Sequence, residues 1–213
     1  MVIYHPMPVE TYPFALKIAP RHERLLSRWA GCRRFVFNEL LIKVLLPIRT
    51  QRQKEWEQTG KSETPYPSAY DLQKLLPSLK EQYPWLKEPP SHSLQQAIID
   101  LHAALQRFFE GVGFPRLKRR GRSTDSWREN DPRLFTVEQH NSRIKLSKLG
   151  GVRYHSSRSF KGSPKTLTMV RKGKRWFASI QVETPPLETP VVHPNAHSAV
   201  GIDRGVAVFA AVS

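Results

Sequence analysis

The stretch YPFALKIAPRHERLLSRW, residues 12–29, decides how the rest of the chain has to fold. Its first part alternates apolar and polar side chains, which predicts a strand over residues 12–18 with Phe14, Leu16 and Ile18 on one face. Pro20 ends the strand, and helical spacing follows at once. The backbone of this early strand needs hydrogen-bonding partners, and the next strand-like patterns come only after residue 114.

Helical periodicity begins at residue 21 and continues to residue 46. Its apolar stripe consists of Leu25, Trp29, Cys32, Val36 and Leu40. Gly31 lies inside the stripe and leaves two alternatives open. It either breaks the segment into a helix-turn-helix, or the helix continues through a tolerated glycine.

Three further segments complete the predicted helical half. Residues 47–67 suit a charged helical turn and a loop, and a short helix is expected over residues 69–80. The segment 91–113 is the clearest helix of the chain, with Ser91 or Ser93 available as its N-cap. Its apolar stripe is interpreted as core packing.

The second half reads as short strands. Candidate strands cover residues 134–139, 143–150, 151–155 and 166–183. The last is a predicted hairpin with Lys172, Gly173 and Lys174 at its turn. Close spacing of short strands predicts a small barrel or twisted sheet.

We therefore expect an α+β fold in which a β-barrel is interrupted by an inserted helical bundle. The expected domains are a barrel over residues 9–20 and 114–185, helices over 21–113, a proline-rich linker over 186–197, and one more strand over 198–213.

The charge of the chain points to a polyanionic partner. The 213 residues carry 34 Lys and Arg against 18 Asp and Glu, a net charge of +16. Residues 112–175 hold 18 of those cations and four of the acids. Nucleic acid is the expected partner, because no apolar run approaches a membrane span and the N-terminus lacks a signal-peptide pattern. The single cysteine, Cys32, excludes an internal disulfide and a multi-cysteine zinc site.

The most basic stretch, FPRLKRRGRS at residues 114–123, is a candidate phosphate-binding segment. A localisation-type charge run would look similar. Aromatic residues among the later strands either stack on bases or fill a barrel core. They are Trp127, Tyr154, Phe160 and Trp176.

Few residues suit catalysis or metal binding. His193 and His197 are four apart, but Pro194 between them argues against the helix that a metal pair would need. Cys32 lies on an apolar stripe and is interpreted as a packed thiol. Asp203, in VGIDRGV, follows an apolar lead-in as a strand-end carboxylate would. Taken alone, an Asp at a strand end before a glycine is more often a turn residue than a catalyst.

Three stretches together resemble the TnpB family of transposon-encoded RNA-guided nucleases (OrfB-type transposases). The first is GCRRFVFN at residues 31–38, and the second is the helix LQQAIIDLHAALQRFF running into GFPRLKRRGRS. The third, VGIDRGV around Asp203, is similar to the first acidic motif of the family's RuvC nuclease domain.

The resemblance implies a wedge-like barrel, a helical recognition domain and the first strand of an incomplete RNase H-like (RuvC) domain. It implies guide RNA and DNA as partners, a role in transposition and DNA recombination, and a prokaryotic, cytoplasmic, nucleoid-associated protein. RuvC chemistry uses three carboxylates around two Mg²⁺ ions, and only Asp203 matches them here. The family's zinc-ribbon cysteines are absent, so no zinc is expected.

We accordingly expect the N-terminal portion of a TnpB-like protein, truncated after its first RuvC motif, that binds nucleic acid without cleaving it alone. Two alternatives stay open: a stand-alone DNA-binding accessory protein of a transposon, or half of a split Mg²⁺-dependent nuclease completed by a second chain. Asp203 is the catalytic and metal-ligand candidate. The candidate nucleic-acid contacts are Arg33, Arg34, Arg116, Lys118, Arg119, Arg120, Arg122, Lys172, Lys174 and Arg175.

Overall fold

The computed structural model describes residues 8–184, 202–203 and 211–212. Contacts divide the chain into two units, and the larger one, Val9–Thr184, contains the main sheet and all the described helices. The smaller unit contributes an antiparallel pair of short strands, β8 (Ile202–Asp203) and β9 (Ala211–Val212). These two strands are all that the described residues show of the strand region expected at 198–213.

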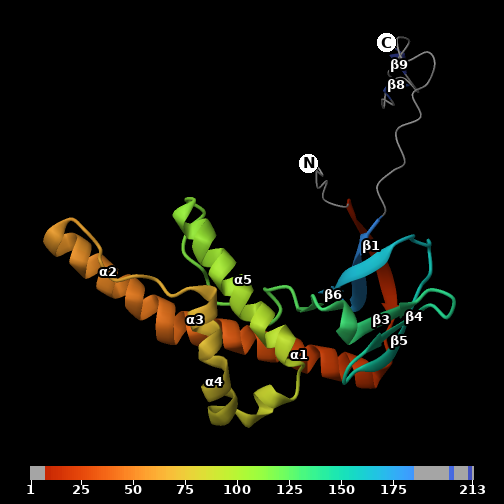
Figure 1. The fold of residues 1–213 in the computed structure, drawn as a ribbon, viewed down its shortest axis with the longest axis horizontal. Helices are drawn as coiled ribbons and strands as arrows, with labels where there is room; N and C mark the ends of the chain where they lie inside the picture. The colour runs from red at the N-terminus through yellow and green to blue at the C-terminus, as the bar shows by residue number, and fades with distance from the viewer. Residues whose placement is uncertain (1–7, 185–201, 204–210, 213) are drawn as a thin grey trace, which may run out of the picture. The chain divides into compact units, whose positions relative to one another are not determined.

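Five α-helices follow the first strand and precede the second in the larger unit (Figure 1). They are α1 (Pro20–Leu40), α2 (Leu46–Thr59), α3 (Ala69–Lys74), α4 (Leu76–Gln82) and α5 (Ser91–Phe109). Short helical turns are the π-helical η1 (Leu41–Leu45) and the 3₁₀ turns η2 (Pro84–Lys87) and η3 (Pro132–Leu134). The strands are β1 (Val9–Lys17), β2 (Ser126–Glu129), β3 (Phe135–Glu138), β4 (Arg143–Leu146), β5 (Gly150–Tyr154), β6 (Ser163–Lys172) and β7 (Arg175–Glu183).

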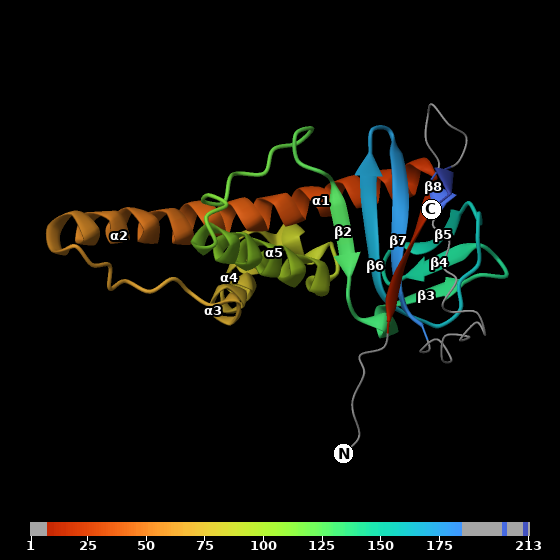
Figure 2. The same cartoon turned by 90° about the horizontal axis from the view of Figure 1, so that it is seen from above.

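The early strand β1 lies in the middle of a seven-stranded sheet of order β2-β6-β7-β1-β5-β4-β3 (Figure 2). Its residues Val9–Ala15 pair antiparallel with β7, and Leu16 and Lys17 pair with β5. The prediction that its partners come from the second half of the chain is therefore confirmed. The hairpin prediction is also confirmed, because β6 and β7 pair throughout and Lys172 lies opposite Arg175 across the turn.

The α+β class is confirmed, whereas the sheet is open rather than a closed barrel. Within the described residues, the edge strands β2 and β3 pair only with β6 and β4 and not with each other. The free side of β2 is occupied instead by α1 and α5, which contact it directly. Helices cover one edge of this sheet in the way that a closing strand would.

One continuous helical rod runs from Pro20 to Thr59, so the helix continues through Gly31 and no helix-turn-helix forms there. A glycine costs an exposed helix about 1 kcal/mol, which the burial of the flanking apolar stripe outweighs. Further along, a proline inside a helix removes one hydrogen bond and crowds the preceding turn. The π-helical turn η1 directly precedes Pro47 and gives the backbone room there. Gly60, in the left-handed conformation, ends the rod.

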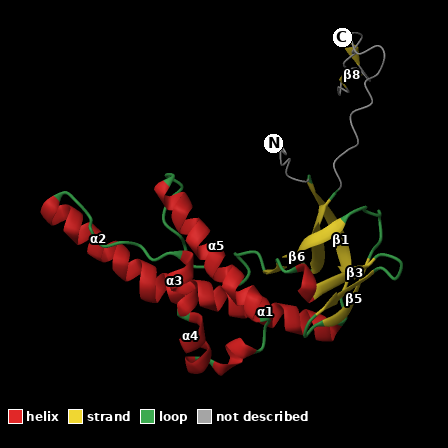
Figure 3. Cartoon of the chain, viewed as in Figure 1, coloured by secondary structure: helices red, strands yellow, loops and turns green. Residues whose placement is uncertain are grey.

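The segments predicted at 69–80 and 91–113 form α3, α4 and α5. The predicted serine cap of α5 is wrong, because Pro90 takes the N-cap position without a side-chain hydrogen bond. Ser93 is fully buried, and the Ser91 hydroxyl instead accepts a hydrogen bond from Lys80 at 2.8 Å. Helices α2, α3 and α4 lie apart from the strands, whereas α1 and α5 reach the sheet (Figure 3).

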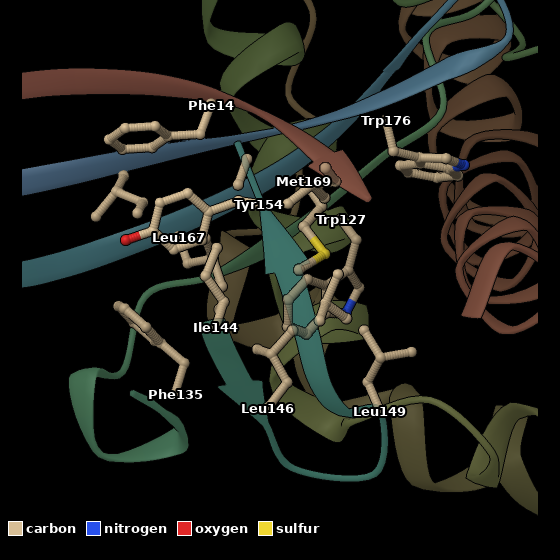
Figure 4. Close-up of a cluster of buried hydrophobic side chains, with 14 of the residues drawn as sticks. Phe14, Trp127, Phe135, Ile144, Leu146, Leu149, Tyr154, Leu167, Met169 and Trp176 are labelled. Carbon is tan, nitrogen blue, oxygen red and sulfur yellow. The ribbon is translucent and has the colours of Figure 1, made fainter. Parts of the chain in front are cut away.

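Two hydrophobic cores meet along α1. The sheet core takes Leu26 and Trp29 from the first half of this helix, and the helical core takes the residues from Cys32 onward. Figure 4 shows the sheet core, in which side chains from both halves of the sheet share one interior. The sequence left open whether four aromatic residues stack on bases or fill the core. All four are buried in this core, at 1–6% exposure: Trp127, Tyr154, Phe160 and Trp176. The core alternative is therefore the observed one.

Gly162 provides a test of how closely the chain packs at the start of β6. Its φ is +117°, and a Cβ added there would lie 2.3 Å from the Glu183 carbonyl oxygen. Gly173 has a φ of +60° but open space around it. We expect Gly162→Ala to lower the free energy of unfolding by about 3 kcal/mol or more, from strain plus the clash. Gly173→Ala should cost about 1 kcal/mol. Urea unfolding of the two variants checks this, and equal losses would contradict the clash.

Candidate nucleic-acid interface

The basic loop between α5 and β2, residues 110–125, is fixed to the helical rod at its centre. The Asn38 amide donates to the Lys118 carbonyl oxygen at 2.9 Å, and the Lys118 backbone N–H donates to the Asn38 side-chain oxygen at 2.8 Å. Further on, the Arg119 N–H donates to the Ser123 hydroxyl at 2.9 Å. The Asn38 side chain thus satisfies one backbone N–H and one carbonyl oxygen of the loop, as a neighbouring strand would.

Lys118 is turned inward rather than toward solvent. Its ammonium lies 3.9 Å from the centroid of the Phe37 ring, a cation–π contact. Burial lowers the pKa of Lys118, with the nearby Arg33 guanidinium adding to the decrease. In this structure the side chain of this predicted phosphate contact helps to seat the loop on α1.

Arg33 is buried at the place where α1, α5 and β2 meet. Only 6% of its surface is exposed, and one guanidinium nitrogen lies 2.7 Å from an Asp100 carboxylate oxygen. The second terminal nitrogen, Nη1, donates to the carbonyl and hydroxyl oxygens of Ser126 at the start of β2. Desolvation lowers the pKa of Arg33, and the Asp100 carboxylate opposes that decrease. This arginine is enclosed by protein and is not presented on the surface.

Arg34 is mostly enclosed as well. Its guanidinium forms an ion pair with Asp125, the last residue before β2, and 15% of its side chain is exposed. Burial is the main cause of a lowered pKa for Arg34, and Arg120 contributes further. Neighbouring arginines of α1 therefore bind two successive residues, Asp125 and Ser126.

The remaining predicted cations of the loop are exposed and, within the described residues, form no ion pair. They are Arg116, Arg119, Arg120 and Arg122. Backbone geometry supports this exposure, because Gly121 adopts a φ of +79° at the turn that separates Arg120 from Arg122. Exposed guanidinium groups without acidic partners are suited to phosphate oxygens.

Two hollows flank these arginines. The first, of about 850 Å³, lies between the loop and the helical rod and is lined by Arg49, Arg116, Arg119 and Arg122 beside apolar residues such as Phe114. The second, of about 670 Å³, lies between the loop and the β6–β7 hairpin and is lined by Arg120, Arg122, Arg171 and Lys172, with Asp125 as its one acid. Asp125 is paired with Arg34, and Arg171 of the second hollow is paired with Glu23 at 3.5 Å. The unopposed positive charge of the two hollows therefore comes mainly from the loop arginines.

Sequence reasoning missed Arg49 and Arg171 as members of this interface. The Arg49 guanidinium lies 4.5 Å from the centroid of the Phe114 ring, so helix and loop share a cation–π contact. The unbroken helix through Pro47 is what carries Arg49 to the loop, and that continuity was not predicted. Lys174 and Arg175, in contrast, are exposed at the hairpin turn but line neither hollow.

No metal centre accompanies this interface in the part of the chain that the structure describes. No three His, Cys, Asp or Glu residues there lie close enough together to bind a metal ion. Asp203 lies opposite Ala211 in the β8–β9 pair, and its side chain is not described. His193 and His197 fall outside the described residues. Cys32 is 4% exposed, and burial raises its pKa to about 11, as expected for a packed thiol.

A buried carboxylate that sequence reasoning did not single out lies at the far end of β2. Glu129 is 1% exposed, and its carboxylate lies 3.2 Å from His92 Nδ1 at the start of α5. The two line a small hollow of about 210 Å³ with Trp127. Burial raises the pKa of Glu129, while the Asp131 and Asn130 backbone N–H groups and His92 oppose the increase. This pair joins α5 to the sheet.

The comparisons with known proteins agree with the motif-based resemblance. No family model matches the chain. Over 206 residues it is 38% identical to the Escherichia coli (strain K12) protein named "Putative RNA-guided DNA endonuclease InsQ". The aligned stretch covers 96% of this chain and 47% of that protein. Over 208 residues it is 28% identical to a Streptomyces pristinaespiralis protein named "Putative RNA-guided DNA endonuclease", covering 94% and 47%.

The chain thus spans about half the length of the curated relatives it matches. The resemblance to the TnpB family of RNA-guided nucleases is confirmed, over a partial length of such proteins. In the described part of the chain, no helix has the length and apolar character required to cross a membrane.

The Arg33–Asp100 pair gives a prediction for stability. Asp100→Asn would leave the enclosed Arg33 guanidinium without its counter-charge, so we expect a loss of about 2–3 kcal/mol in the free energy of unfolding. The matched control is Glu88→Gln, which removes the carboxylate paired with the exposed Arg28 at 2.7 Å and should cost less than about 1 kcal/mol. Chemical denaturation measures both. Similar losses in the two variants would show that Arg33 does not organise the junction.

Glu129 gives a prediction for pH dependence. A carboxyl group whose pKa is raised by folding contributes stability that is fully present below its unfolded pKa and is lost as pH rises through its folded pKa. The free energy of unfolding of the wild type, relative to that of Glu129→Gln, should therefore be higher at pH 4 than at pH 7.5. Denaturation midpoints at the two values check this, with His92→Gln in both backgrounds to subtract the titration of its partner. A difference that grows with pH would contradict it.

Proposed function

We propose that this chain is the guide-RNA- and target-DNA-binding portion of a TnpB-like RNA-guided DNA endonuclease. The observation that carries the proposal is the set of four exposed, unpaired arginines on the loop at residues 110–125, placed between two basic hollows. The curated relatives are named RNA-guided DNA endonucleases, which supports RNA and DNA as the polyanions concerned. In such systems base pairing reads the target, and the protein contacts mainly the backbone.

The arrangement of elements supports different roles for the sheet and for the helices. We propose that the sheet, with β1 and the strands after residue 125, acts as the wedge-like domain. The helices between β1 and β2 would act as the recognition domain. Since the loop at 110–125 joins the two, it can bind a nucleic acid that lies across their boundary. Lys172, at the edge of the second hollow, would add a contact from the hairpin.

Cleavage is not proposed for this chain alone. Asp203 is the one residue that matches a RuvC carboxylate, and a two-metal mechanism requires several such groups around the ions. Among the described residues no cluster suits a metal ion. We therefore propose Asp203 as one contributor to a nuclease site whose other carboxylates lie elsewhere, and derive no catalytic step from it.

The arginine loop is tested by replacing Arg116, Arg119, Arg120 and Arg122 with glutamine. Each lost phosphate contact should reduce the slope of log Kobs against log[salt] by about 0.7 on single-stranded RNA, so the four together should reduce it by about 3. Fluorescence anisotropy with a labelled 20-nucleotide RNA, between 50 and 300 mM salt, measures the slope.

The matched control replaces four exposed lysines outside both hollows, which leaves the same net charge. They are Lys54, Lys61, Lys87 and Lys161. The control should keep most of the wild-type slope. If the arginine variant and the lysine variant show the same slope, binding depends on net charge alone and the loop is not the interface.

A further inference from the structure

A second group of cations lies on the sheet, away from the loop at 110–125. The register places Lys17 of β1 directly opposite Arg153 of β5, and Arg153 directly opposite Arg143 of β4. Directly opposed residues point to the same face of a sheet, and all three are exposed. We refer to Lys17, Arg153 and Arg143 as the strand row.

The strand row is electrostatically costly to the folded chain. Like charges directly opposite each other destabilise a sheet, and the row has two such pairs side by side. In the described part of the chain none of the three forms an ion pair. Glu138 of β3 lies directly opposite Arg143 and so continues the row with an acid, but its carboxylate is bound to Lys145, which lowers its pKa. Among the described residues, no ion pair of these three cations offsets the repulsion within the row.

A hollow of about 670 Å³ opens beside the row. Its lining combines Lys17 and Arg153 with the β3–β4 turn and the segment after β5. Those two segments bring hydroxyl, amide and imidazole groups and no carboxylate: His140, Asn141, Ser142, His155, Ser156 and Ser157. Cations together with hydrogen-bond donors are the groups that bind phosphate oxygens.

We propose that the strand row and its hollow form a second binding site for a phosphodiester backbone, separate from the arginine loop. With strands about 4.8 Å apart, three cations in a row extend over about 10 Å, the axial rise of about three nucleotides of one strand. A row therefore matches an extended polyanion better than a single phosphate group.

The site extends the proposed function to another surface but stands on its own residues. Neither Lys17, Arg143 nor Arg153 lines either hollow of the arginine loop. The two sites can therefore be inactivated one at a time, and failure of one assignment leaves the other intact.

The test replaces Lys17, Arg143 and Arg153 with glutamine in the full chain, and the control replaces Lys54, Lys61 and Lys161, with equal loss of charge. The probes are a labelled 20-nucleotide single-stranded RNA, a 20-base-pair RNA duplex and the DNA duplex of the same sequence. We expect the row variant to reduce the salt slope by about 2 on single strands and by about 3 on duplexes. Because the expected loss is the same for the two duplexes, the duplex with the larger loss identifies whether RNA or DNA occupies the site.

Four outcomes separate the two assignments. A loss in the row variant alone supports this site and overturns the arginine loop, and a loss in the loop variant alone does the reverse. Losses in both that add in the combined variant support two independent sites. Equal slopes for the row variant and its lysine control overturn the present proposal. Thermal unfolding guards against misfolding: relief of like-charge repulsion should leave the melting temperature of the row variant unchanged or higher.

A residue-level readout needs no substitution. Lysine acetylation with an N-hydroxysuccinimide ester, followed by peptide mass spectrometry, reports how exposed each ammonium is. Bound nucleic acid should lower the labelling of Lys17 at least several-fold while Lys54 and Lys61 remain unchanged. Equal labelling of Lys17 with and without saturating probe would overturn the site.

Discussion

The guanidinium of Arg33 is the constraint on which the rest of the larger unit depends. It lies where the sheet core and the helical core meet. Along α1, Trp29 before it belongs to the sheet core and Val36 after it belongs to the helical core. Its partner Asp100 also accepts from Gln96, and Gln96 accepts from Asn130 just after β2. A buried charge without partners would cost several kcal/mol, so α1, α5 and β2 can meet in few other arrangements.

That junction also determines which cations remain available at the surface. Arg34 binds Asp125, Lys118 lies over Phe37, and Asn38 holds the loop backbone, so the inner side of the loop is fully engaged by α1. The arginines left over point outward from a backbone that is already ordered. A preordered set of donors loses less conformational entropy when it binds phosphate, which favours a loop fixed in this way over a free basic tail.

Sequence patterns predicted the elements that depend on local periodicity, and they failed for features that depend on contacts between distant parts of the chain. The strand β1, the β6–β7 hairpin and α5 follow from alternation, turn chemistry and helical spacing, and all were found. The open sheet was not predicted, because the cover on β2 comes from helices far away in the sequence. Periodicity also could not predict which of two neighbouring cations, such as Arg33 and Arg34 or Lys118 and Arg119, is enclosed by the protein. The partners that decide this come from distant parts of the chain.

The partners of each cation, rather than the local density of cations, distinguish those that stabilise the fold from those available to a ligand. Lys148 illustrates the structural class: its ammonium donates to the carbonyl oxygens of Lys87, Glu88 and Pro89 and so ties the β4–β5 turn to the helical side. Such a lysine stabilises the fold and has few donors left for a ligand. Cations without acids, gathered in register or along a hollow, raise the energy of the free chain, and a bound polyanion removes that repulsion. The basic surface is thereby a cost to the isolated chain, and in the proposed function it is also the source of affinity for nucleic acid.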